Sequence, residues 1–324
     1  MTQLIVELCQ NHCGDRTLLG EMIAAAAENG ADIVKSQIIF SEDLTHRKEF
    51  DEGEILSDGT VIAIKRPYAS EYERLKTLDL TEDDHRFFVE ECSRNKVLPM
   101  TTIFSRNRIP FAASLLWPKR IVKVASYDCA SYQMLKGLSE HFDHLYISTG
   151  ATFDEEVTKT AELMGVCGKT FSLLHCVTSY PNTIEMCNLR RIQWLRQFTP
   201  SVGWSDHTLV KRDGLKASKA AIALGADVIE RHFTILPEDK TKDGPVSITP
   251  ALLKELNEFS MLDVATQTQE IRKEIPDWGT ILGTETRPLT HAELLNRDYY
   301  RGRFASKVDG KWVYNWEKAD ISLS

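Results

Sequence analysis

Short runs of β-branched and aliphatic residues alternate with longer helical patterns along most of this chain, and this alternation leaves few folds open. Strands separated by helices form parallel β–α–β units. Eight such strands fit a closed barrel better than an open sheet. The predicted strands cover residues 4–10, 32–38, 97–104, 121–126, 144–149, 171–178, 201–207 and 228–234. The sequence therefore predicts an α/β fold, a (β/α)8 TIM barrel.

Signals that end a helix and begin a strand recur at two distant points. Asn29-Gly30 supplies a left-handed C-terminal cap, and the chain continues into the apolar residues Ile33 and Val34. A second helical stretch stops at Gly225 and leads into Val228. A repeated glycine cap followed by an apolar strand is expected of a fold built from successive βα units.

Two segments depart from the repeat. Residues 40–96 contain a helical stretch over residues 83–92, and the acidic run at residues 51–54 indicates an extended active-site loop. After residue 275 the pattern changes, and an Asp309-Gly310 turn between residues 303–308 and 311–314 predicts a β-hairpin. We expect a barrel domain over residues 1–275 and a C-terminal extension over residues 276–324 that packs against it.

The composition limits the partners. The 324 residues carry a formal net charge of −8, which argues against a general binder of nucleic acid or anionic membranes. The longest apolar stretches are far shorter than the roughly 20 residues of a membrane helix. Glu7 interrupts the first apolar run before a signal-peptide core could form. We expect a cytoplasmic protein in which a local cationic pocket for a small anion remains allowed.

The seven cysteines favour the same compartment. Their number is odd, they are spread along the chain, and no CxxC pair occurs, which is untypical of a secreted disulfide scaffold. Cys176 follows His175, which raises the alternative of a catalytic Cys–His pair. Adjacent residues of a strand point to opposite faces, so a packed thiol is favoured instead.

Polar side chains gather at the predicted C-terminal ends of all eight strands, where the chemistry of a barrel is located. A purely structural strand would be filled with Val, Ile and Leu. The polar ends include Glu7, Gln10, Lys35, Gln37, Thr102, Ser105, Lys123, Ser126, Ser148, Thr178, Tyr180, Ser205, Asp206, Glu230 and Arg231. Their recurrence predicts a ligand site at this end of the barrel.

Lys35 and Lys123 each interrupt an apolar strand. Lysine is almost never fully buried without a partner, so each pairs with a core carboxylate, for which Glu7 is available, or faces an anion. Nearby hydroxyls favour the anion, because neutral donors suit phosphate oxygens while the lysines supply charge. These hydroxyls belong to Thr102, Ser126, Ser148 and Ser205.

His207 and His232 end consecutive predicted strands. Neighbouring strands lie about 4.8 Å apart, so both imidazoles could reach one cation. Two histidines completed by water and substrate suit a catalytic divalent ion such as Mn²⁺ or Mg²⁺, while a structural role is the alternative. Zinc is disfavoured because no third clear ligand is evident. Asp206 is expected to orient backbone or a neighbouring group, and for His12 a ligand, substrate-contact or structural role stays open.

These residues together resemble the N-acylneuraminate (sialic acid) synthase family. The resemblance runs in order through residues 4–250 and includes every predicted strand end. The matching residues are Glu7, Asn11, His12, Gly14, Gly30, Ala31, Asp32, Val34, Lys35, Gln37, Thr102, Phe104, Ser105, Lys123, Ser126, Ser148, Thr149, Gly150, His175, Cys176, Tyr180, Pro181, Gly203, Ser205, Asp206, His207, Thr208, Gly225, Ala226, Glu230, Arg231, His232, Phe233 and Thr234.

The resemblance implies a TIM-barrel transferase that condenses phosphoenolpyruvate with an N-acylmannosamine-like sugar aldehyde, giving a nonulosonic 2-keto acid and phosphate. It also implies roles by position. The residues implied for phosphoenolpyruvate are Lys35, Thr102, Lys123, Ser126, Ser148 and Ser205. Those implied for the sugar are Gln37, Tyr180, Glu230 and Asp243. The implied metal ligands are His207 and His232, and the catalytic residues are Glu7, Lys35, His207 and Glu230.

Reaction chemistry agrees with these roles. The enol carbon of phosphoenolpyruvate is a weak nucleophile, so a divalent cation must polarise the aldehyde oxygen. Water must then add to C2 before phosphate leaves, which requires a carboxylate that positions or deprotonates it. Glu7 is the candidate.

The chain also departs from the family pattern. The family's C-terminal antifreeze-like domain, which reaches the partner subunit's site, is not expected here. Gly244-Pro245-Val246 stands where the family has Gly-Pro-Asp, with Asp243 shifted in sequence, and Thr178 replaces a common Asn or Ser. The phosphate and metal halves match better than the sugar half, which leaves open the acceptor, the choice of Mn²⁺ or Mg²⁺, any homo-oligomer, and whether another protein supplies the domain.

Two other functions are compatible with the sequence. One is a different metal-dependent barrel enzyme, a hydrolase, lyase or class II-type aldolase, although hydrolases of this type often use a His-x-His pair that is missing here. The other is a pseudoenzyme that binds phosphoenolpyruvate or a sugar phosphate without turnover. Metal stoichiometry would test the first, and binding without turnover would favour the second.

Overall fold

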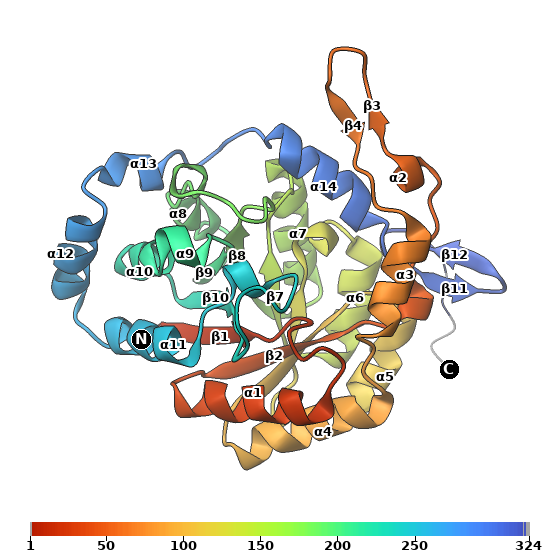
Figure 1. Cartoon of the computed structure of the whole chain (residues 1–324), viewed down its shortest axis with the longest axis horizontal. Coiled ribbons are helices and arrows are strands. Elements are labelled where there is room, and N and C mark those ends of the chain that lie inside the picture. Colours follow the sequence, from red (N-terminus) through yellow and green to blue (C-terminus); the bar gives the residue numbers. More distant parts are fainter. Residues whose placement is uncertain (1, 320, 322–324) are drawn as a thin grey trace.

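Eight parallel strands close into one barrel in the computed structural model, which describes residues 2–319 and residue 321. β1 pairs with β2 on one side and with β10 on the other, and so closes the sheet. The strands are β1 (Gln3–Glu7), β2 (Ile33–Ile38), β5 (Leu98–Ile103), β6 (Ile121–Val124), β7 (His144–Ser148), β8 (Thr170–Cys176), β9 (Ser201–Asp206) and β10 (Val228–His232). All eight predicted strands, and the TIM barrel, are confirmed (Figure 1).

Most strands end one to three residues before their predicted ends. β1 stops at Glu7, and residues 8–14 form successive turns in which the Asn11 amide donates to the Leu8 carbonyl. The polar residues leave the strand ladder at this point because their backbone groups bond locally. They are thereby placed above the sheet, at the mouth of the barrel.

Helices surround the barrel in the positions that the helical patterns predict. In α1 (Arg16–Glu28) the Asp15 side chain accepts from the Thr17 and Leu18 amides, and Met22 and Ile23 face the strands. The other surrounding helices are α4 (Glu82–Arg94), α5 (Ile109–Ser114), α6 (Tyr132–His141), α7 (Asp154–Val166), α8 (Arg191–Leu195), α9 (Val210–Asp213), α10 (Lys216–Ala223) and α11 (Pro250–Ser260). Short 3-10 turns are η1 (Ser41–Asp43), η2 (Arg106–Arg108), η3 (Ser126–Asp128), η4 (Ile184–Met186) and η5 (Gly244–Val246).

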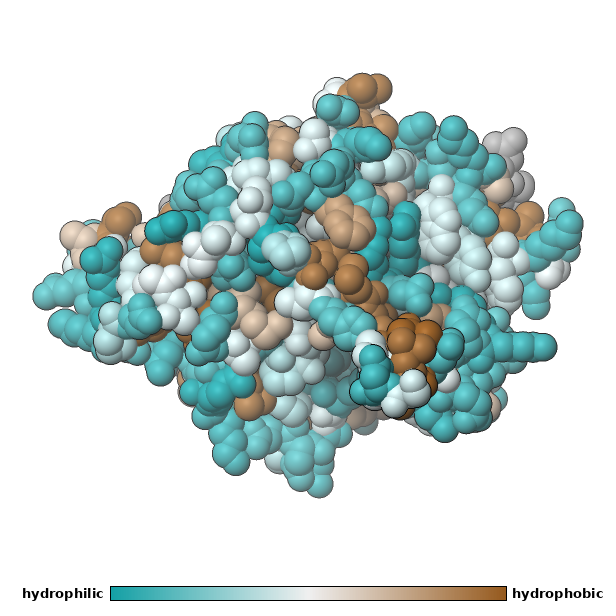
Figure 2. Space-filling view, turned by 90° about the horizontal axis from the view of Figure 1, so that it is seen from above, coloured by the Kyte–Doolittle hydropathy of each residue, from teal (hydrophilic) through white to brown (hydrophobic). Residues whose placement is uncertain are grey.

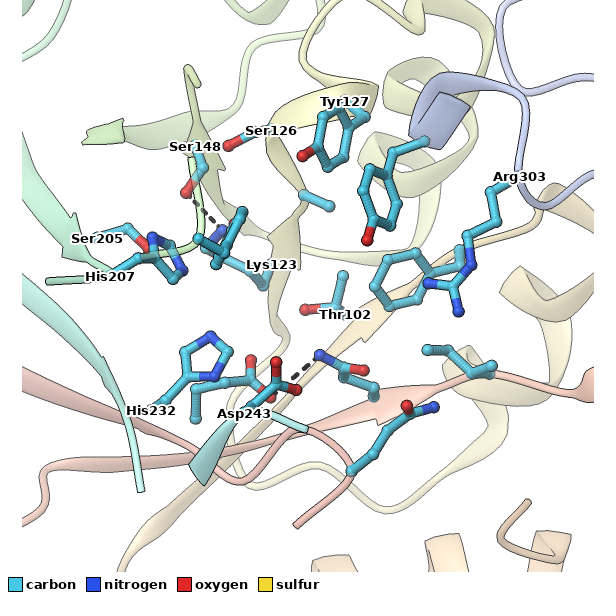
Figure 3. A pocket seen from close by; sticks show the side chains of 18 of the residues that line it. Thr102, Lys123, Ser126, Tyr127, Ser148, Ser205, His207, His232, Asp243 and Arg303 are labelled. Atoms are coloured by element: carbon cyan, nitrogen blue, oxygen red, sulfur yellow. Dashed lines mark hydrogen bonds between the residues drawn. The ribbon is translucent and has the colours of Figure 1, made fainter. Parts of the chain in front are cut away.

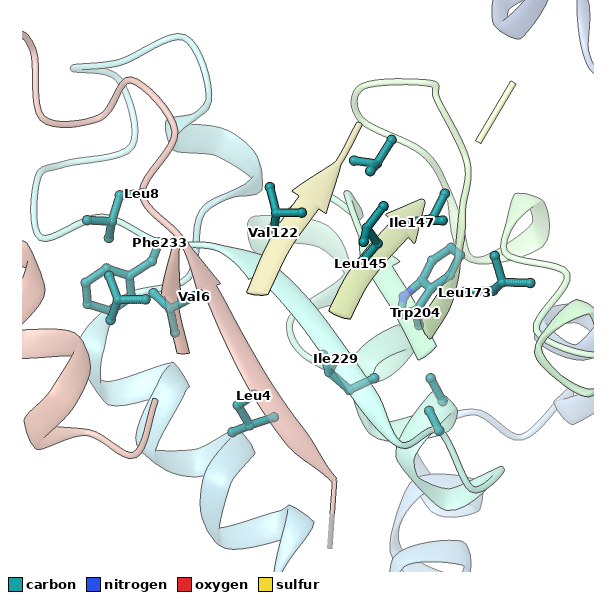
Figure 4. Packing of buried hydrophobic residues seen from close by; sticks show 14 of the residues in the cluster. Leu4, Val6, Leu8, Val122, Leu145, Ile147, Leu173, Trp204, Ile229 and Phe233 are labelled. Carbon is teal, nitrogen blue, oxygen red and sulfur yellow. The ribbon is translucent and has the colours of Figure 1, made fainter. Parts of the chain in front are cut away.

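The core has two layers, because successive strand side chains point to opposite faces. Outward-facing residues such as Leu4, Val6 and Trp204 pack between strands and helices (Figure 4). A smaller inner layer fills the N-terminal end of the barrel interior. It consists of Ile5, Ile33, Met100, Ile121, Tyr146, Leu174 and Val228. The interior is therefore apolar at one end and free for polar residues at the other.

The segment between β2 and β5 differs from the expected loop. Residues 51–54 belong to α2 (Glu49–Glu52) and the start of β3 (Glu54–Ile55), which pairs with β4 (Val61–Ala63), and α3 (Tyr68–Lys76) follows. The hairpin projects from the body of the molecule (Figure 1). Its Asp58-Gly59 turn, with a Gly59 φ of 89°, has the same chemistry as the hairpin that was predicted near the C-terminus.

The barrel segment ends with α12 (Val264–Glu274), and the C-terminal extension contains α13 (Trp278–Leu282), α14 (His291–Arg301), β11 (Ser306–Val308) and β12 (Lys311–Val313). Asp309 and Gly310 have φ angles of 47° and 77°, which confirms the predicted hairpin turn. α14 lies beside the strand ends, since the Asn296 amide donates to the Thr178 carbonyl over 2.8 Å.

The surface agrees with this architecture. Figure 2 shows one face on which hydrophilic side chains predominate and hydrophobic ones form small patches. Within the described part of the chain, no helix combines the length and the apolar character needed to cross a membrane.

Candidate active site

Seven of the eight barrel strands change from an apolar to a more polar residue along the inner side of the barrel. Ile5 belongs to the inner apolar layer, and Glu7, two residues later, faces the same interior. The period of two in a strand makes this step general. The other pairs are Ile33 and Lys35, Met100 and Thr102, Ile121 and Lys123, Tyr146 and Ser148, Leu174 and Cys176, and Val228 and Glu230.

A cavity of about 370 Å³ lies above the inner layer and receives side chains from all eight strands. This volume is in the range of small-molecule sites. The structure brings every predicted site residue to this one cavity (Figure 3). These residues are Glu7, Lys35, Gln37, Thr102, Lys123, Ser126, Ser148, Tyr180, Ser205, His207, Glu230, His232 and Asp243.

The two buried lysines share acidic and hydroxyl partners. Lys35 forms ion pairs with Glu7 and, over 3.3 Å, with Glu230, and it donates to the Thr102 hydroxyl over 2.9 Å. Lys123 donates to the Ser148 hydroxyl over 2.7 Å and lies 3.4 Å from Glu230. The carboxylate pairing that the sequence left open for Lys35 is thus present, and it coexists with the hydroxyl contacts expected beside an anion.

Burial and neighbouring charges shift the pKa values of Lys35 and Glu230. Burial lowers the pKa of Lys35 to about 8, although Glu230 opposes the shift. For Glu230, burial raises the pKa, but Lys123, Lys35 and His207 together outweigh it and lower the pKa to about 2. Glu230 is therefore ionised at neutral pH and holds both ammonium groups in the cavity.

Hydroxyl and backbone donors surround Lys123. The Gly150 amide donates to the Ser126 hydroxyl over 3.2 Å, and Ser148 contacts Lys123 directly. A Cβ at Gly150 would lie 2.5 Å from the Thr178 methyl carbon, so the turn requires glycine at this position. The result is a compact set of donors at the ends of β6 and β7 that suits a phosphate group.

His207 and His232 lie together on one side of the cavity (Figure 3). Their ring centroids are 5.0 Å apart, and burial lowers the pKa of both imidazoles. The buried Nδ1 of His232 has no hydrogen-bond partner among the described residues. A neutral ring with a free buried nitrogen fits a divalent metal ion. Asp243, which the resemblance assigned to the sugar, lies beside His232.

Cations that sequence reasoning missed form the cavity mouth. Arg66, Arg74, Lys242 and Arg303 all line it, while Glu71 pairs with Arg303 and, over 2.9 Å, with Arg74. Burial lowers the pKa of the Lys242 ammonium, Glu71 opposes this, and the three arginines lower it further. These four residues, which we call the cationic mouth, come from α3, the segment before it, the loop after β10 and the C-terminal extension, so no local pattern joins them.

The extension supplies further lining residues on which the sequence gave no signal. Asn296 and Tyr300 project from α14 into the cavity lining, and the Tyr300 ring stacks on Tyr127 with centroids 4.9 Å apart. Asp128 also lines the cavity, and burial raises its pKa to about 6.

Other sequence hypotheses also have structural outcomes. His12 Nδ1 accepts from the Gly14 amide over 3.0 Å, and His12 is not among the lining residues, which favours its structural role. His175 bonds to the Cys187 carbonyl while Cys176 faces the cavity, so the two do not form a catalytic pair. The run at residues 51–54 does not line the cavity, because it is used in α2 and β3.

Comparisons with known proteins match most of the chain to synthases of one family. The NeuB family model matches residues 22–270. The chain is 32% identical to the N,N'-diacetyllegionaminic acid synthase of Legionella pneumophila, covering 94% of this chain and 83% of that protein. It is 29% identical to the N-acetylneuraminate-9-phosphate synthase of Drosophila melanogaster, over 84% of this chain and 72% of the other. A crystal structure of the N-acetylneuraminic acid (sialic acid) synthetase of Leptospira borgpetersenii, in complex with citrate, superimposes with a TM-score of 0.68 at 25% identity, covering 92% and 90% of the two chains.

Proposed function

Because the chain belongs to the NeuB family of sialic-acid-type synthases, we propose that it joins phosphoenolpyruvate to an N-acylmannosamine-like sugar aldehyde, giving a nonulosonic 2-keto acid and phosphate. The protein is thus a phosphoenolpyruvate-dependent condensing enzyme. C3 of phosphoenolpyruvate forms a bond to the aldehyde carbon, water adds at C2, and the bond from C2 to the phosphate oxygen breaks.

The observation that carries this proposal is the pair of buried lysines among hydroxyl donors. Phosphoenolpyruvate has a phosphate and a carboxylate on one carbon. Lys123 with Ser126, Ser148 and Ser205 would hold the phosphate, and Lys35 with Thr102 would hold the carboxylate. On binding, the substrate's charges would take over part of the pairing that Glu7 and Glu230 provide to these lysines.

Glu7 and Glu230 are the two carboxylates that would act near the reacting carbons, and they would have different roles. Glu7 accepts from the Cys9 amide over 2.5 Å and from the Gln37 side chain over 3.3 Å, which fixes its carboxylate in the cavity. In this position it would orient the water that attacks C2 and take up its proton. Glu230 would stay ionised and keep both lysines in place. The rest of the rate enhancement comes from holding the two substrates together.

The metal part of the proposal uses His207 and His232. When bound by these imidazoles, Mn²⁺ or Mg²⁺ supplies Lewis-acid polarisation of the aldehyde oxygen. Tyr180 lies against His207 with centroids 4.2 Å apart, and with Gln37 and Asp243 it would orient the sugar near this point.

A cytoplasmic location belongs to the proposal as well. The seven cysteines are all free, as expected in a reducing compartment. Any homo-oligomer would be settled by the solution mass of the purified protein.

The proposal is tested by phosphate release from phosphoenolpyruvate with Mn²⁺ and a panel of N-acylated amino-sugar aldehydes. We expect release with at least one acceptor and its loss in Lys123→Met. Lys219→Met is a matched control, because Lys219 is also largely buried but lies on α10 and pairs with Glu255 and Glu274. It should retain activity.

The outcomes separate the alternatives. If the folded, Mn²⁺-loaded protein binds phosphoenolpyruvate in calorimetry but releases no phosphate with any acceptor, the pseudoenzyme replaces the synthase. If it does not bind phosphoenolpyruvate at all, the site serves another ligand.

A further inference from the structure

Three potential metal ligands of different chemistry meet at the end of the barrel. The ligand atoms of Cys9, His232 and Asp243 all lie within 4.8 Å of one another. Cys9 lies in the turn after β1, His232 ends β10, and Asp243 lies in the loop after β10. Bonds of about 2.0–2.3 Å place the ligands of one ion within about 4.6 Å of each other, so the cluster needs only small side-chain movements to bind one.

Two features single out the cluster. The Nδ1 atom of His232 is buried and has no hydrogen-bond partner among the described residues, although a buried polar atom is normally paired. Cys9 is 1% exposed and has a φ of 41°, in the left-handed region that non-glycine residues seldom occupy. Such backbone persists where the surroundings fix it, and it occurs often at ligand sites. The thiol is thus held beside the histidine that the metal hypothesis already uses.

We propose that Cys9 and Asp243 join His232 as metal ligands, giving a mixed sulfur, nitrogen and oxygen site that prefers borderline-soft divalent ions such as Zn²⁺ or Co²⁺ to Mg²⁺. This inference rests on the metal part of the proposed function and changes the identity of the ion. Thiolate ligands select softer metals, whereas Mg²⁺ prefers carboxylate, carbonyl and water oxygens. The sequence disfavoured zinc because no third ligand was evident. Cys9 and Asp243 supply such ligands, since the fold brings them next to His232.

The ligand set also has a chemical balance. Cys9 binds as a thiolate, and its proton passes to the buffer when the metal enters. The thiolate and the Asp243 carboxylate then neutralise a divalent charge, while His232 contributes a neutral nitrogen. His207 lies next to this cluster, with its ring centroid 5.0 Å from that of His232, but it does not belong to the three-residue group.

The experiment is a Co²⁺ titration of the metal-free protein, followed by absorption. A sulfur ligand gives a strong near-ultraviolet charge-transfer band that nitrogen and oxygen ligands do not give. We expect the band in the parent protein, its loss in Cys9→Ser, and at least about tenfold weaker Co²⁺ binding in chelator competition. Binding of Mg²⁺ should be unchanged in the same variant.

Cys176→Ser is the matched control. Cys176 is likewise a buried cysteine; it lines the cavity, and its sulfur lies 3.6 Å from Nδ1 of His207. This variant should retain the band. Cys9→Gly, which tolerates the left-handed backbone, provides a second test if Cys9→Ser does not fold.

Absence of the band in the folded parent, or its loss in Cys176→Ser but not in Cys9→Ser, would overturn the proposal. The readout needs neither phosphoenolpyruvate nor turnover. A charge-transfer band without phosphate release would therefore support the metal site and contradict the proposed function. Phosphate release without the band would contradict the metal site and support the proposed function.

Discussion

Single residues in the cavity are held by charges that compensate one another. Lys35 contacts both Glu7 and Glu230, and Glu230 also lies beside Lys123. The two carboxylates are not equivalent, because Glu230 has two lysine partners and Glu7 accepts hydrogen bonds from Cys9 and Gln37. This difference is the basis for the proposed roles, charge-holding for Glu230 and proton transfer for Glu7.

Glu7→Gln tests that assignment. The amide keeps the shape of the side chain but cannot accept a proton, so we expect turnover to fall by about 10²–10⁴-fold. Binding of phosphoenolpyruvate should change much less. Phosphate release measures the first effect and calorimetry the second. A variant that keeps turnover within tenfold of the parent would mean that Glu7 only balances the charge of Lys35.

Burial of His85 is expected to make the stability of the protein depend on pH. Its ring is 1% exposed, lies between Phe40 and Phe111, and has no hydrogen-bond partner at either nitrogen among the described residues. Burial lowers its pKa from 6.5 to about 4. Between pH 6.5 and 4 the unfolded chain therefore binds a proton that the native protein does not. The stabilisation present above pH 6.5 is lost as pH falls, by roughly 3 kcal/mol across this window.

His85→Leu should remove this dependence. Leucine fills a similar volume in α4, leaves no unpaired nitrogen, and should raise the free energy of unfolding at pH 7 by about 1–3 kcal/mol. Urea unfolding at pH 4.5 and pH 7 should show a smaller difference between the two conditions than in the parent. An unchanged pH slope would indicate that the ring nitrogens bind water or protein groups in solution.

At the scale of elements, the barrel strands and the polar positions on them were predictable, because both follow from a period of two. Once Ile121 is placed inside the barrel, Lys123 must face the same interior. The Asp58-Gly59 hairpin carried an equally clear turn signal within a segment interpreted as a loop. Local patterns thus account for the strands, the helices and the inner part of the site.

The outer part of the site could not be predicted in this way. Arg74 and Arg303 meet through Glu71 although they are far apart in the sequence, and Cys9 meets Asp243 only because the loop after β10 returns to the barrel mouth. These contacts depend on how loops fold over the barrel. No periodicity in the chain encodes them, and the family model ends at residue 270, before the extension begins.

Arg303→Ala tests whether these elements bind the acceptor. Arg303 belongs to the cationic mouth and its side chain is 11% exposed, so its loss should raise the KM for the acceptor sugar by about tenfold, the cost of one charge-assisted hydrogen bond. An acceptor that carries an anionic group should be affected more than a neutral one. Binding of phosphoenolpyruvate should not change, because its predicted ligands lie deeper.

Arg301→Ala is the control for that experiment. Arg301 ends α14 but lies over the Trp316 ring and is not among the lining residues. Equal effects of the two substitutions on the KM would show that Arg303 acts only by stabilising the extension.

At the scale of the whole molecule, the C-terminal extension meets the loops that follow three barrel strands at the mouth of the barrel. The Thr45 amide donates to the Arg303 carbonyl, and the Ala305 amide donates to the Asp43 carbonyl. Asn315 donates both to the Phe104 carbonyl and to the Asp128 carboxylate, which lines the cavity. The extension therefore connects the ends of β2, β5 and β6 and lines part of the candidate site. Figure 1 shows α14 and the β11–β12 hairpin packed against the barrel.

This arrangement predicts that barrel and extension unfold in one transition, and that a chain ending at residue 275 is severely destabilised. Phe304 is 4% exposed and packs with Ile39, Leu44 and Leu75, so truncation uncovers a small core of its own. Each such side chain contributes roughly 1.5–3 kcal/mol by burial, and losing several should lower the Tm by about 10 °C or more. Thermal unfolding followed by circular dichroism measures the change.

Replacing residues 56–60 with a shorter turn is the control, because that hairpin tip projects away from the body and its loss should change the Tm by only a few degrees (Figure 1). A truncated protein that melts near the parent temperature would show that the barrel is stable alone. The extension would then act only on the acceptor, and its removal should raise the KM for the sugar while binding of phosphoenolpyruvate persists.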